Sequence, residues 1–378
     1  MINEFIITQT NPKTGFIDLG MGNPDLRLLP LDALRQSAEA YFASGDTRPL
    51  QYGAEQGDGY FRAALADCLS QAYRNSVNPK HLFVTSGASS ALDLLCALYT
   101  HPGEVIFVEE PTYFLALRIF NDHGLKIIPI SMDEHGLCLE ELDELLAQYR
   151  PKFLYTIPTF QNPSGRTLTQ ARREELIARA RRDNFFIVAD EVYQLLPYSR
   201  TLPVPFAAFA QDVEQVISVN SFSKILAPGL RLGWIQAHEH IIERLAGSGL
   251  LDSGGGMNPF TSALVRGLIE SGGLEANIAH LRREYARRLK VMDAALRLHL
   301  PGAEYAIPQG GFFFWIHLPG VDTEKLRENA KQYKVDFRQG ELFSSRRAMR
   351  EYIRLSFAYY APEEIEEGVK RLGACLRC

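Results

Sequence analysis

From about residue 80, the chain alternates short apolar, β-branched runs with stretches whose apolar positions recur at helical spacing. The apolar runs predict strands at 81–85, 104–108, 126–130, 152–157, 185–189, 216–219 and 231–236. The stretches between them predict helices at 88–98, 113–123, 139–148 and 170–182, the last with Thr169 as its N-cap. Alternation of this kind indicates an α/β domain with a mostly parallel, seven-stranded sheet and helices on both faces.

The pattern changes near residue 251, where the run L-D-S-G-G-G-M-N at 251–258 predicts a break. A helical stretch to about residue 270 and a long charged helix at 274–298 follow. Strand candidates then come at 312–317, 335–337 and 352–357, before a last helix at 362–372. This part of the chain predicts a smaller α+β domain.

Bulk properties exclude several classes of partner. The chain has 378 residues, 22% of them charged, and a net charge of −5 without a basic block, so nucleic acid is not expected as a partner. No apolar run is long enough to span a membrane, and the N-terminus does not resemble a signal peptide. The scattered cysteines favour a reducing compartment, so we expect a cytoplasmic protein. A lone C-x-x-C, Cys375 to Cys378, is interpreted as a solvated tail, and no metal site is expected.

Candidate chemistry lies directly after the strands, because ligands of parallel sheets bind beyond the carboxyl ends of the strands. Gly87-Ala88-Ser89 opens a helix after the first strand and could seat an anion on its backbone N–H groups, although a simple capping turn fits as well. Tyr113 follows the second strand and could stack on a planar ligand or belong to the core.

Two further strands end in polar groups. Asn162, held between prolines in P-T-F-Q-N-P-S-G, would present its amide rigidly, with turn chemistry alone as the alternative. Asp190 ends a buried strand, where a carboxylate is costly without a cationic partner, and Tyr193 follows three residues later. Both positions are therefore candidates for contacts with a bound polar molecule.

The stretch S-F-S-K-I-L-A-P-G-L-R places Ser221, Ser223, Lys224 and Arg231 after the strand at 216–219. Arginine suits a phosphate because its fork contacts two oxygens. A lysine beside a cation in a desolvated site has a lowered pKa and becomes a nucleophilic amine. Together with the other strand ends, these groups complement pyridoxal 5′-phosphate, which has a phosphate, a planar ring, a protonatable ring nitrogen, a phenolic oxygen and an aldehyde.

At these residues the chain resembles the fold-type I class I/II aminotransferases that use pyridoxal 5′-phosphate, and most of all the 2-aminoadipate and kynurenine aminotransferase branch. The motifs S-x-S-K-x-x-x-P-G-x-R-x-G and P-x-x-Q-N-P-x-G carry the resemblance, which extends over nearly the whole chain. It implies the fold of that family. The division it implies is a large cofactor-binding domain at 46–273, a small domain at 274–378, and an N-terminal segment, 1–45, that joins the small domain and closes over the substrate.

The resemblance also implies residue roles. Lys224 would form the Schiff base with the cofactor and then move the proton between Cα and the cofactor carbon. Asp190 would keep the ring nitrogen protonated. Asn162 and Tyr193 would bond the phenolic oxygen, and Tyr113 would stack on the ring. Lys224, Asp190 and Tyr113 are thus the expected catalytic residues.

Other implied roles concern the phosphate, the substrate and a second subunit. The expected phosphate contacts are Ser221, Ser223, Arg231 and the turn Gly87-Ala88-Ser89. Tyr52 resembles the tyrosine that reaches the partner subunit's phosphate, so a homodimer is expected. Arg354 would clamp the substrate carboxylate, with Asn162 and Gly22 also on the substrate side.

The expected function is transfer of an amino group from an aromatic or 2-aminoadipate-like amino acid to a 2-oxo acid such as 2-oxoglutarate. The alternatives are another reaction of the same cofactor (β-elimination, decarboxylation or cyclisation) and a ligand-sensing regulator domain, which the acidic charge and the absence of a preceding DNA-binding domain disfavour. Arg27 could meet an acidic substrate side chain or be solvated. The aromatic residues at 312–315 are divided between core and site by strand alternation. Gly254 to Gly256 either opens space at the site entrance or breaks a helix.

Overall fold

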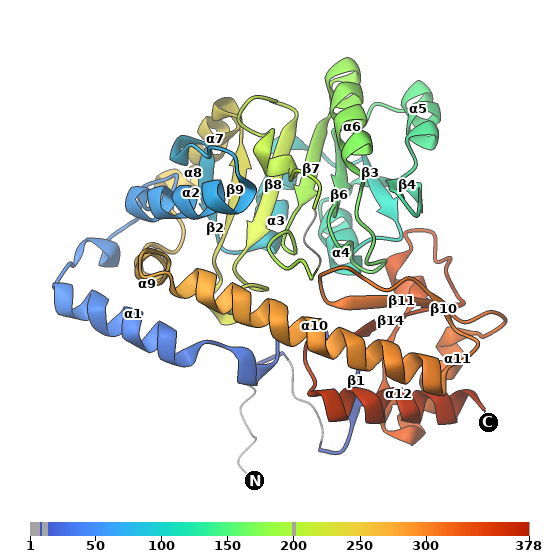
Figure 1. Cartoon of the computed structure of the whole chain (residues 1–378). Coiled ribbons are helices and arrows are strands. Elements are labelled where there is room, and N and C mark those ends of the chain that lie inside the picture. Colours follow the sequence, from blue (N-terminus) through green and yellow to red (C-terminus); the bar gives the residue numbers. More distant parts are fainter. Residues whose placement is uncertain (1–7, 10–13, 199–201, 378) are drawn as a thin grey trace, which may run out of the picture.

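The computed structural model describes residues 8–9, 14–198 and 202–377. Its main sheet has the strand order β2-β9-β8-β7-β6-β3-β4-β5 (Figure 1). The strands are β2 (Leu82–Thr85), β3 (Val105–Glu110), β4 (Lys126–Asp133), β5 (Gly136–Leu137), β6 (Phe153–Thr156), β7 (Phe186–Asp190), β8 (Val216–Ser221) and β9 (Gly233–Ala237). The seven predicted strands are all present, and the central pairs from β8 to β4 are parallel, whereas β9 runs antiparallel to both of its neighbours. The eighth strand, β5, is a two-residue hairpin partner of β4, too short to leave a periodic pattern.

Helices cover both faces of this sheet, as the alternation predicted. They are α2 (Gly59–Tyr73), α3 (Ala88–Tyr99), α4 (Phe114–Asp122), α5 (Leu139–Gln148), α6 (Gln170–Asp183) and α7 (Glu239–Ala246). Side chains of β3 alternate between two cores: Ile106 and Val108 pack in one cluster with α3 and α4, and Phe107 packs in the other with α5 and α6. The predicted N-cap of α6 is confirmed, because the Thr169 hydroxyl accepts a hydrogen bond from the backbone N–H of Arg172.

A second sheet lies beside the first and is antiparallel, with the order β10-β11-β14-β13. Its strands are β10 (Glu304–Tyr305), β11 (Phe313–His317), β14 (Tyr352–Ser356) and β13 (Arg338–Gln339). The helices of this part are α10 (Gly273–His299), α11 (Thr323–Ala330) and α12 (Pro362–Leu376). In Figure 1, α10 passes below both sheets and ends beside α12. Because α12 continues to Leu376 and Cys375 is only 6% exposed, the solvated-tail interpretation is wrong for Cys375; Cys378 lies outside the described residues.

The N-terminal segment contacts both parts of the molecule. Strand β1 (Ile17–Asp18) pairs in parallel with β12 (Val335–Asp336) beside the small sheet. Helix α1 (Leu31–Ser44) packs instead along α9 (Pro259–Glu270), where the Ser37 hydroxyl donates to the carbonyl of Leu264. The chain between these two elements, 19–30, therefore runs past the edge of the main sheet.

The predicted break in the run 251–258 is confirmed, and it begins at Gly255. Helix α8 (Gly249–Gly254) continues through Leu251 and ends only at Gly255, which has a left-handed φ of 72°. Gly255 and Gly256 lie against the backbone of Gly53, and a Cβ on Gly256 would collide with the carbonyl oxygen of Ala54. The helix therefore breaks here, as one of the two sequence interpretations held, and the close backbone approach explains why Gly255 and Gly256 are glycines.

Candidate active site at the carboxyl edge of the main sheet

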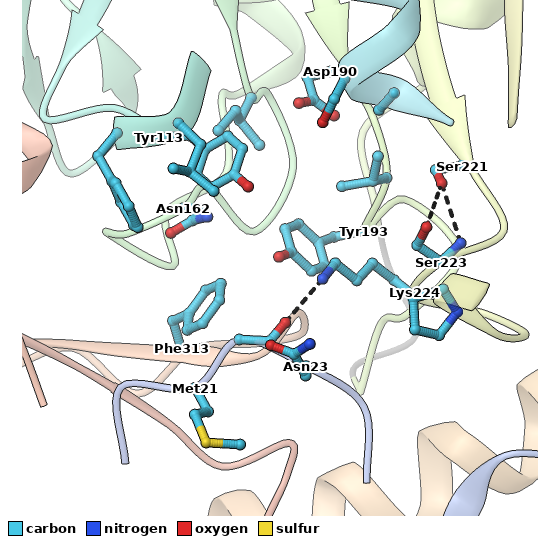
Figure 2. A pocket seen from close by; sticks show the side chains of 18 of the residues that line it. Met21, Asn23, Tyr113, Asn162, Asp190, Tyr193, Ser221, Ser223, Lys224 and Phe313 are labelled. Atoms are coloured by element: carbon cyan, nitrogen blue, oxygen red, sulfur yellow. Dashed lines mark hydrogen bonds between the residues drawn. The ribbon is translucent and has the colours of Figure 1, made fainter. Parts of the chain in front are cut away.

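A cavity of about 400 Å³ lies where strands β3, β6, β7 and β8 end. Most of the residues singled out in the sequence line it: Gly22, Ala88, Ser89, Tyr113, Asn162, Asp190, Tyr193, Ser221, Ser223, Lys224, Arg231 and Arg354. Figure 2 shows Lys224, Tyr193, Asn162 and Asp190 around one space, with Met21 and Asn23 of the N-terminal segment on its other side. Residues up to 332 positions apart in the chain, Gly22 and Arg354, thus meet at one site.

One end of the cavity has the features of an anion seat. Gly87 caps α3 with a φ of 95°, and a Cβ there would lie 3.1 Å from Nη2 of Arg231. Nη2 of Arg231 donates to the carbonyl oxygen of Ser86. The hydroxyl of Ser221 donates to the hydroxyl of Ser223 at 2.9 Å. Arg231 reaches this end because β9 runs antiparallel and begins at the edge where the parallel strands finish. Hydroxyls, a guanidinium and a helix start together suit a phosphate.

Asp190 is buried at the end of β7 with only half of its carboxylate satisfied by side chains. The Tyr155 hydroxyl donates to Oδ2 at 2.8 Å, whereas Oδ1 is buried and has no hydrogen-bond partner among the described residues. Burial raises the pKa of Asp190 to about 6, and the hydrogen bond from Tyr155 opposes this rise. An orphaned buried carboxylate oxygen facing a cavity fits a protonated ring nitrogen of a bound molecule.

Lys224 is the amine of the site. Its Nζ donates to the carbonyl oxygen of Gly22 at 2.8 Å (Figure 2) and lies 5.5 Å from the centre of the Phe312 ring. Burial lowers the pKa of Lys224 to about 8, helped by the positive charge of Arg354. The expected depression is therefore present, but the neighbouring cation responsible is Arg354 rather than Arg231.

Arg354 enters the cavity from β14 of the second sheet, whereas Lys224 follows β8 of the main sheet. Its Nη1 donates to Oδ1 of Asn162 and its Nη2 to the carbonyl of Gly20, both at 2.8 Å. The guanidinium lies over the rings of Phe313 at 4.0 Å and Phe343 at 4.9 Å. Burial lowers the pKa of Arg354 to about 10, which leaves it positively charged at neutral pH.

The two tyrosines and Asn162 supply polar groups between these ends. Burial raises the pKa of Tyr113 to about 12 and that of Tyr193 still further, so both remain phenols and can donate hydrogen bonds. Tyr193 is held edge-on against Phe312 and Phe313. Because Oδ1 of Asn162 accepts from Arg354, its amide nitrogen is the group left to donate, as the sequence predicted.

Comparisons with known proteins identify the family. A family model described as "Aminotransferase class I and II" matches residues 14–372. The chain belongs to the class I and II aminotransferases. It is 34% identical over 369 residues to aromatic-amino-acid aminotransferase 1 of Thermococcus litoralis, covering 96% of this chain and 88% of that one.

Solved structures agree with this assignment. A multiple substrate aminotransferase of Thermococcus profundus superposes with a TM-score of 0.90 at 33% identity, covering 97% of this chain and 92% of that one. An α-aminoadipate aminotransferase of Thermus thermophilus, bound to N-(5′-phosphopyridoxyl)-L-leucine, gives a TM-score of 0.88 at 29% identity, covering 96% and 92%. The chain is therefore an amino-acid aminotransferase with the predicted fold, and its cofactor is pyridoxal 5′-phosphate. The anion seat and the unpaired Oδ1 of Asp190 fit that cofactor.

Three of the residues singled out in the sequence do not line this cavity: Gly87, whose neighbours Ala88 and Ser89 do, Tyr52 and Arg27. Tyr52 is 82% exposed and lines a separate, smaller surface cavity with Leu50, Gly256 and Pro259. Arg27 does not line the active-site cavity, because its guanidinium is paired with Asp25 and Glu364. The suggestion that Arg27 meets a substrate side chain is therefore not supported by the structure.

Sequence reasoning did not single out Tyr155 or Arg338, and it left Phe313 undecided. Tyr155 lies beneath Asp190, Phe313 forms part of the cavity wall, and Arg338 lines the cavity beside Arg354. The alternating strand pattern left Phe313 undecided between core and site, and nothing local marked Arg338, which becomes a neighbour of Arg354 only when β13 and β14 pair.

Among the described helices, none combines the length and apolar character that a membrane crossing requires. Within the same residues, no group of three or more His, Cys, Asp or Glu side chains is arranged to hold a metal ion.

Proposed function

We propose that this aminotransferase moves the amino group of an aromatic or 2-aminoadipate-like amino acid to a 2-oxo acid such as 2-oxoglutarate, using Lys224 as its amine. The observation that carries the proposal is the meeting of three groups in one cavity: the Lys224 amine, the unpaired Oδ1 of Asp190 and the Arg354 guanidinium. The relatives named for aromatic amino acids and for α-aminoadipate support this range of donors.

Asp190 would bind the ring nitrogen of the cofactor. When bound, pyridoxal phosphate supplies an aldehyde that accepts an amino group and a ring that withdraws electrons from the substrate Cα. Oδ1 of Asp190 would hold the proton on the ring nitrogen, while Tyr155 keeps Oδ2 occupied. Pairing the buried carboxylate with this cationic nitrogen offsets the cost of its burial.

Lys224 would act twice. Its lowered pKa makes the neutral, nucleophilic amine accessible for cofactor attachment. When it is free, the same amine would take up and release the proton that moves between the substrate Cα and the cofactor. A pKa of about 8 suits a group that must both take up and release a proton near neutral pH.

The other cavity residues would bind and orient. Ser221, Ser223, Arg231 and the turn Gly87-Ala88-Ser89 would hold the phosphate. Asn162 and Tyr193 would donate to the phenolic oxygen, and Tyr113 would cover the ring.

Arg354 would clamp the substrate carboxylate with both arms of its fork, beside Asn162. Gly22, in the N-terminal segment, would close the substrate side. Substrate positioning of this kind holds the Cα–H bond toward Lys224 and contributes strongly to rate.

The active unit would be a homodimer in which Tyr52 contributes to the partner's phosphate site. Large apolar side chains are also exposed in the N-terminal part of the chain that contains Tyr52, which supports burial against a second copy: Leu31, Phe42 and Leu50. A mixing experiment tests this. Hybrids formed from Lys224→Ala and Tyr52→Ala subunits contain one site with both residues intact, so activity should exceed that of either variant alone; no gain on mixing would contradict the shared site.

The remaining proposals concern organisation and location. Residues 46–273 would form the cofactor-binding domain, and 274–378 the small domain together with the N-terminal segment 1–45. The unpaired thiols of Cys68, Cys96 and Cys138 support function in the reducing cytoplasm.

Product analysis with the cofactor-loaded enzyme tests the proposed reaction. An aromatic donor and 2-oxoglutarate should give the donor's 2-oxo acid and glutamate in equal amounts. When the acceptor is omitted, each site should take up at most one amino group, and product formation should then stop. Continuous release of pyruvate and ammonia from a β-substituted donor without any acceptor would indicate elimination instead and would overturn the proposal.

A further inference from the structure

Arg338 is a cation of the active-site cavity that the reaction as proposed does not use. The charged residues lining the cavity are Asp190, Lys224, Arg231, Arg338 and Arg354. Arg231 belongs with the phosphate, Lys224 and Asp190 with the aldehyde and the ring nitrogen, and Arg354 with the substrate carboxylate. The Arg338 guanidinium is therefore the one charged group of the described cavity lining with no assigned partner on the cofactor or the substrate.

Arg338 and Arg354 are direct neighbours across two strands. They are paired residues in the antiparallel β13–β14 ladder, so their side chains lie on the same face of the sheet. The positive charge of Arg338 contributes to lowering the pKa of Arg354, which reflects their proximity. Arg354 is buried, whereas the side chain of Arg338 is 22% exposed, so Arg338 lies on the outer side of the carboxylate clamp.

The present partner of Arg338 is Asp18 of the N-terminal segment. The guanidinium makes a forked pair with it, at 3.0 Å from Nη1 to Oδ1 and 2.9 Å from Nη2 to Oδ2. Nη1 also donates to the carbonyl of Phe337, and Asp336 lies 3.7 Å away but is held by Arg327. A guanidinium has five N–H groups, and these bonds use three of them, so donors remain for a second carboxylate.

We propose that Arg338 binds the distal carboxylate of dicarboxylic substrates, and that Asp18 is the internal anion that occupies Arg338 when the substrate side chain is uncharged. This inference rests on the proposed function and names the residue pair that sets its substrate range. An aromatic side chain then meets a neutral ion pair instead of a bare charge. A dicarboxylate draws the guanidinium from Asp18 while its α-carboxylate stays on Arg354.

Substitutions of Arg338 and of Asp18 should have opposite effects on dicarboxylic substrates. A purely structural ion pair would not give opposite effects. In the cofactor-loaded enzyme, Arg338→Gln should lower kcat/KM for 2-oxoglutarate by about 10-fold or more, because a charge-assisted hydrogen bond is lost, and change that for phenylpyruvate by less than about 3-fold. Asp18→Asn should raise kcat/KM for 2-oxoglutarate, because the competing carboxylate is gone. Arg27→Gln, which alters the arginine outside the cavity, should leave the ratio between the two acceptors unchanged.

A binding measurement separates this inference from the reaction itself. Glutarate, which cannot react, should perturb the cofactor absorption of the wild type at lower concentration than butyrate does, and Arg338→Gln should remove that preference. If Arg338→Gln is poorly folded, Arg338→Lys keeps a charge there and should retain part of the preference. The inference is overturned if glutarate has no advantage over butyrate in the wild type, or if Arg338→Gln and Asp18→Asn lower both acceptors alike. Failure of turnover with every donor, with the glutarate preference intact, would count against the proposed reaction instead.

Discussion

The hydroxyl of Tyr155 donates a 2.8 Å hydrogen bond to Oδ2 of Asp190 and leaves Oδ1 of the same carboxylate without a partner. Tyr155 does not line the cavity, so it acts on the cofactor only through Asp190. The strand register explains the contact. Tyr155 is paired with Val188, two residues before Asp190, so the two side chains are diagonal neighbours on one face of the sheet. Tyr155 is therefore a positioning residue for the carboxylate.

Replacing Tyr155 with Phe should weaken cofactor binding without emptying the site. The lost hydrogen bond had opposed the rise of the pKa of Asp190, so more of the carboxyl is protonated at neutral pH and less charge faces the ring nitrogen. A hydrogen bond to a charged group contributes about 1.5–3 kcal/mol, which corresponds to a Kd for pyridoxal phosphate at least about 10-fold higher. The measurement is cofactor titration followed by absorption, together with the pH midpoint of the bound chromophore.

The matched control is Tyr99→Phe. The Tyr99 hydroxyl is also buried but has no hydrogen-bond partner in the described part of the chain, so its removal should leave both readouts unchanged. A Tyr155→Phe enzyme with wild-type affinity and an unshifted midpoint would show that Tyr155 only fills space.

Cofactor capture by the apo chain should speed up as the pH rises through about 8. Only the neutral amine of Lys224 is nucleophilic, and a pKa of about 8 leaves about one amine in ten neutral at pH 7, against about one in three thousand for an ordinary lysine. Stopped-flow absorption after mixing with pyridoxal phosphate measures the rate. A midpoint near 10.5 would mean that burial and Arg354 do not depress the Lys224 pKa.

Two substitutions at Arg354 should separate its charge from its shape. Both Arg354→Met and Arg354→Lys should lower kcat/KM for every amino acid by about 100-fold or more, because neither offers a planar fork to the carboxylate. Only Arg354→Met should also move the capture midpoint of Lys224 upward, because it removes the positive charge that lowers this pKa. Equal midpoints in the two variants would assign the depression to burial alone.

Gly256→Ala should be destabilising and Gly254→Ala should not. A Cβ on Gly256 collides with the Ala54 carbonyl and separates the backbone from Gly53, next to Tyr52, whereas Gly254 ends α8 with open space around it. Overpacking of this kind costs about 1–3 kcal/mol, while alanine gains about 0.5–1 kcal/mol over glycine inside a helix. Thermal unfolding of the two variants provides the comparison. Equal melting temperatures would contradict the required close approach.

The sequence predicted the main sheet and the cavity residues that follow its strands because both give local signals, whereas Arg354 and Gly22 came only from the family resemblance. Apolar runs mark strands, and the polar residues directly after them meet at one edge in a parallel sheet. Asp190, Asn162 and Lys224 were found in this way. The two-residue strand β5 gave no period to detect.

What the sequence did not predict depends on pairing between distant segments. Arg338 is 16 positions from Arg354 and is its neighbour only through the β13–β14 register. For Arg27, the sequence left open whether it meets an acidic substrate side chain or is solvated. The structure pairs it with Asp25 and Glu364. Position 256 needs a glycine because of its contact with the backbone around Gly53, about 200 residues earlier in the chain. No local pattern reveals this contact.

Covalent trapping shows whether Lys224 is the residue that holds the cofactor. The chain is loaded with pyridoxal phosphate, reduced with borohydride, digested and mapped by mass spectrometry, with Lys224→Ala treated in parallel. We expect a visible chromophore that responds to amino acids, one reduced cofactor per chain on the Lys224 peptide, and neither signal in Lys224→Ala. Label spread over surface lysines, or the same chromophore in Lys224→Ala, would contradict this expectation.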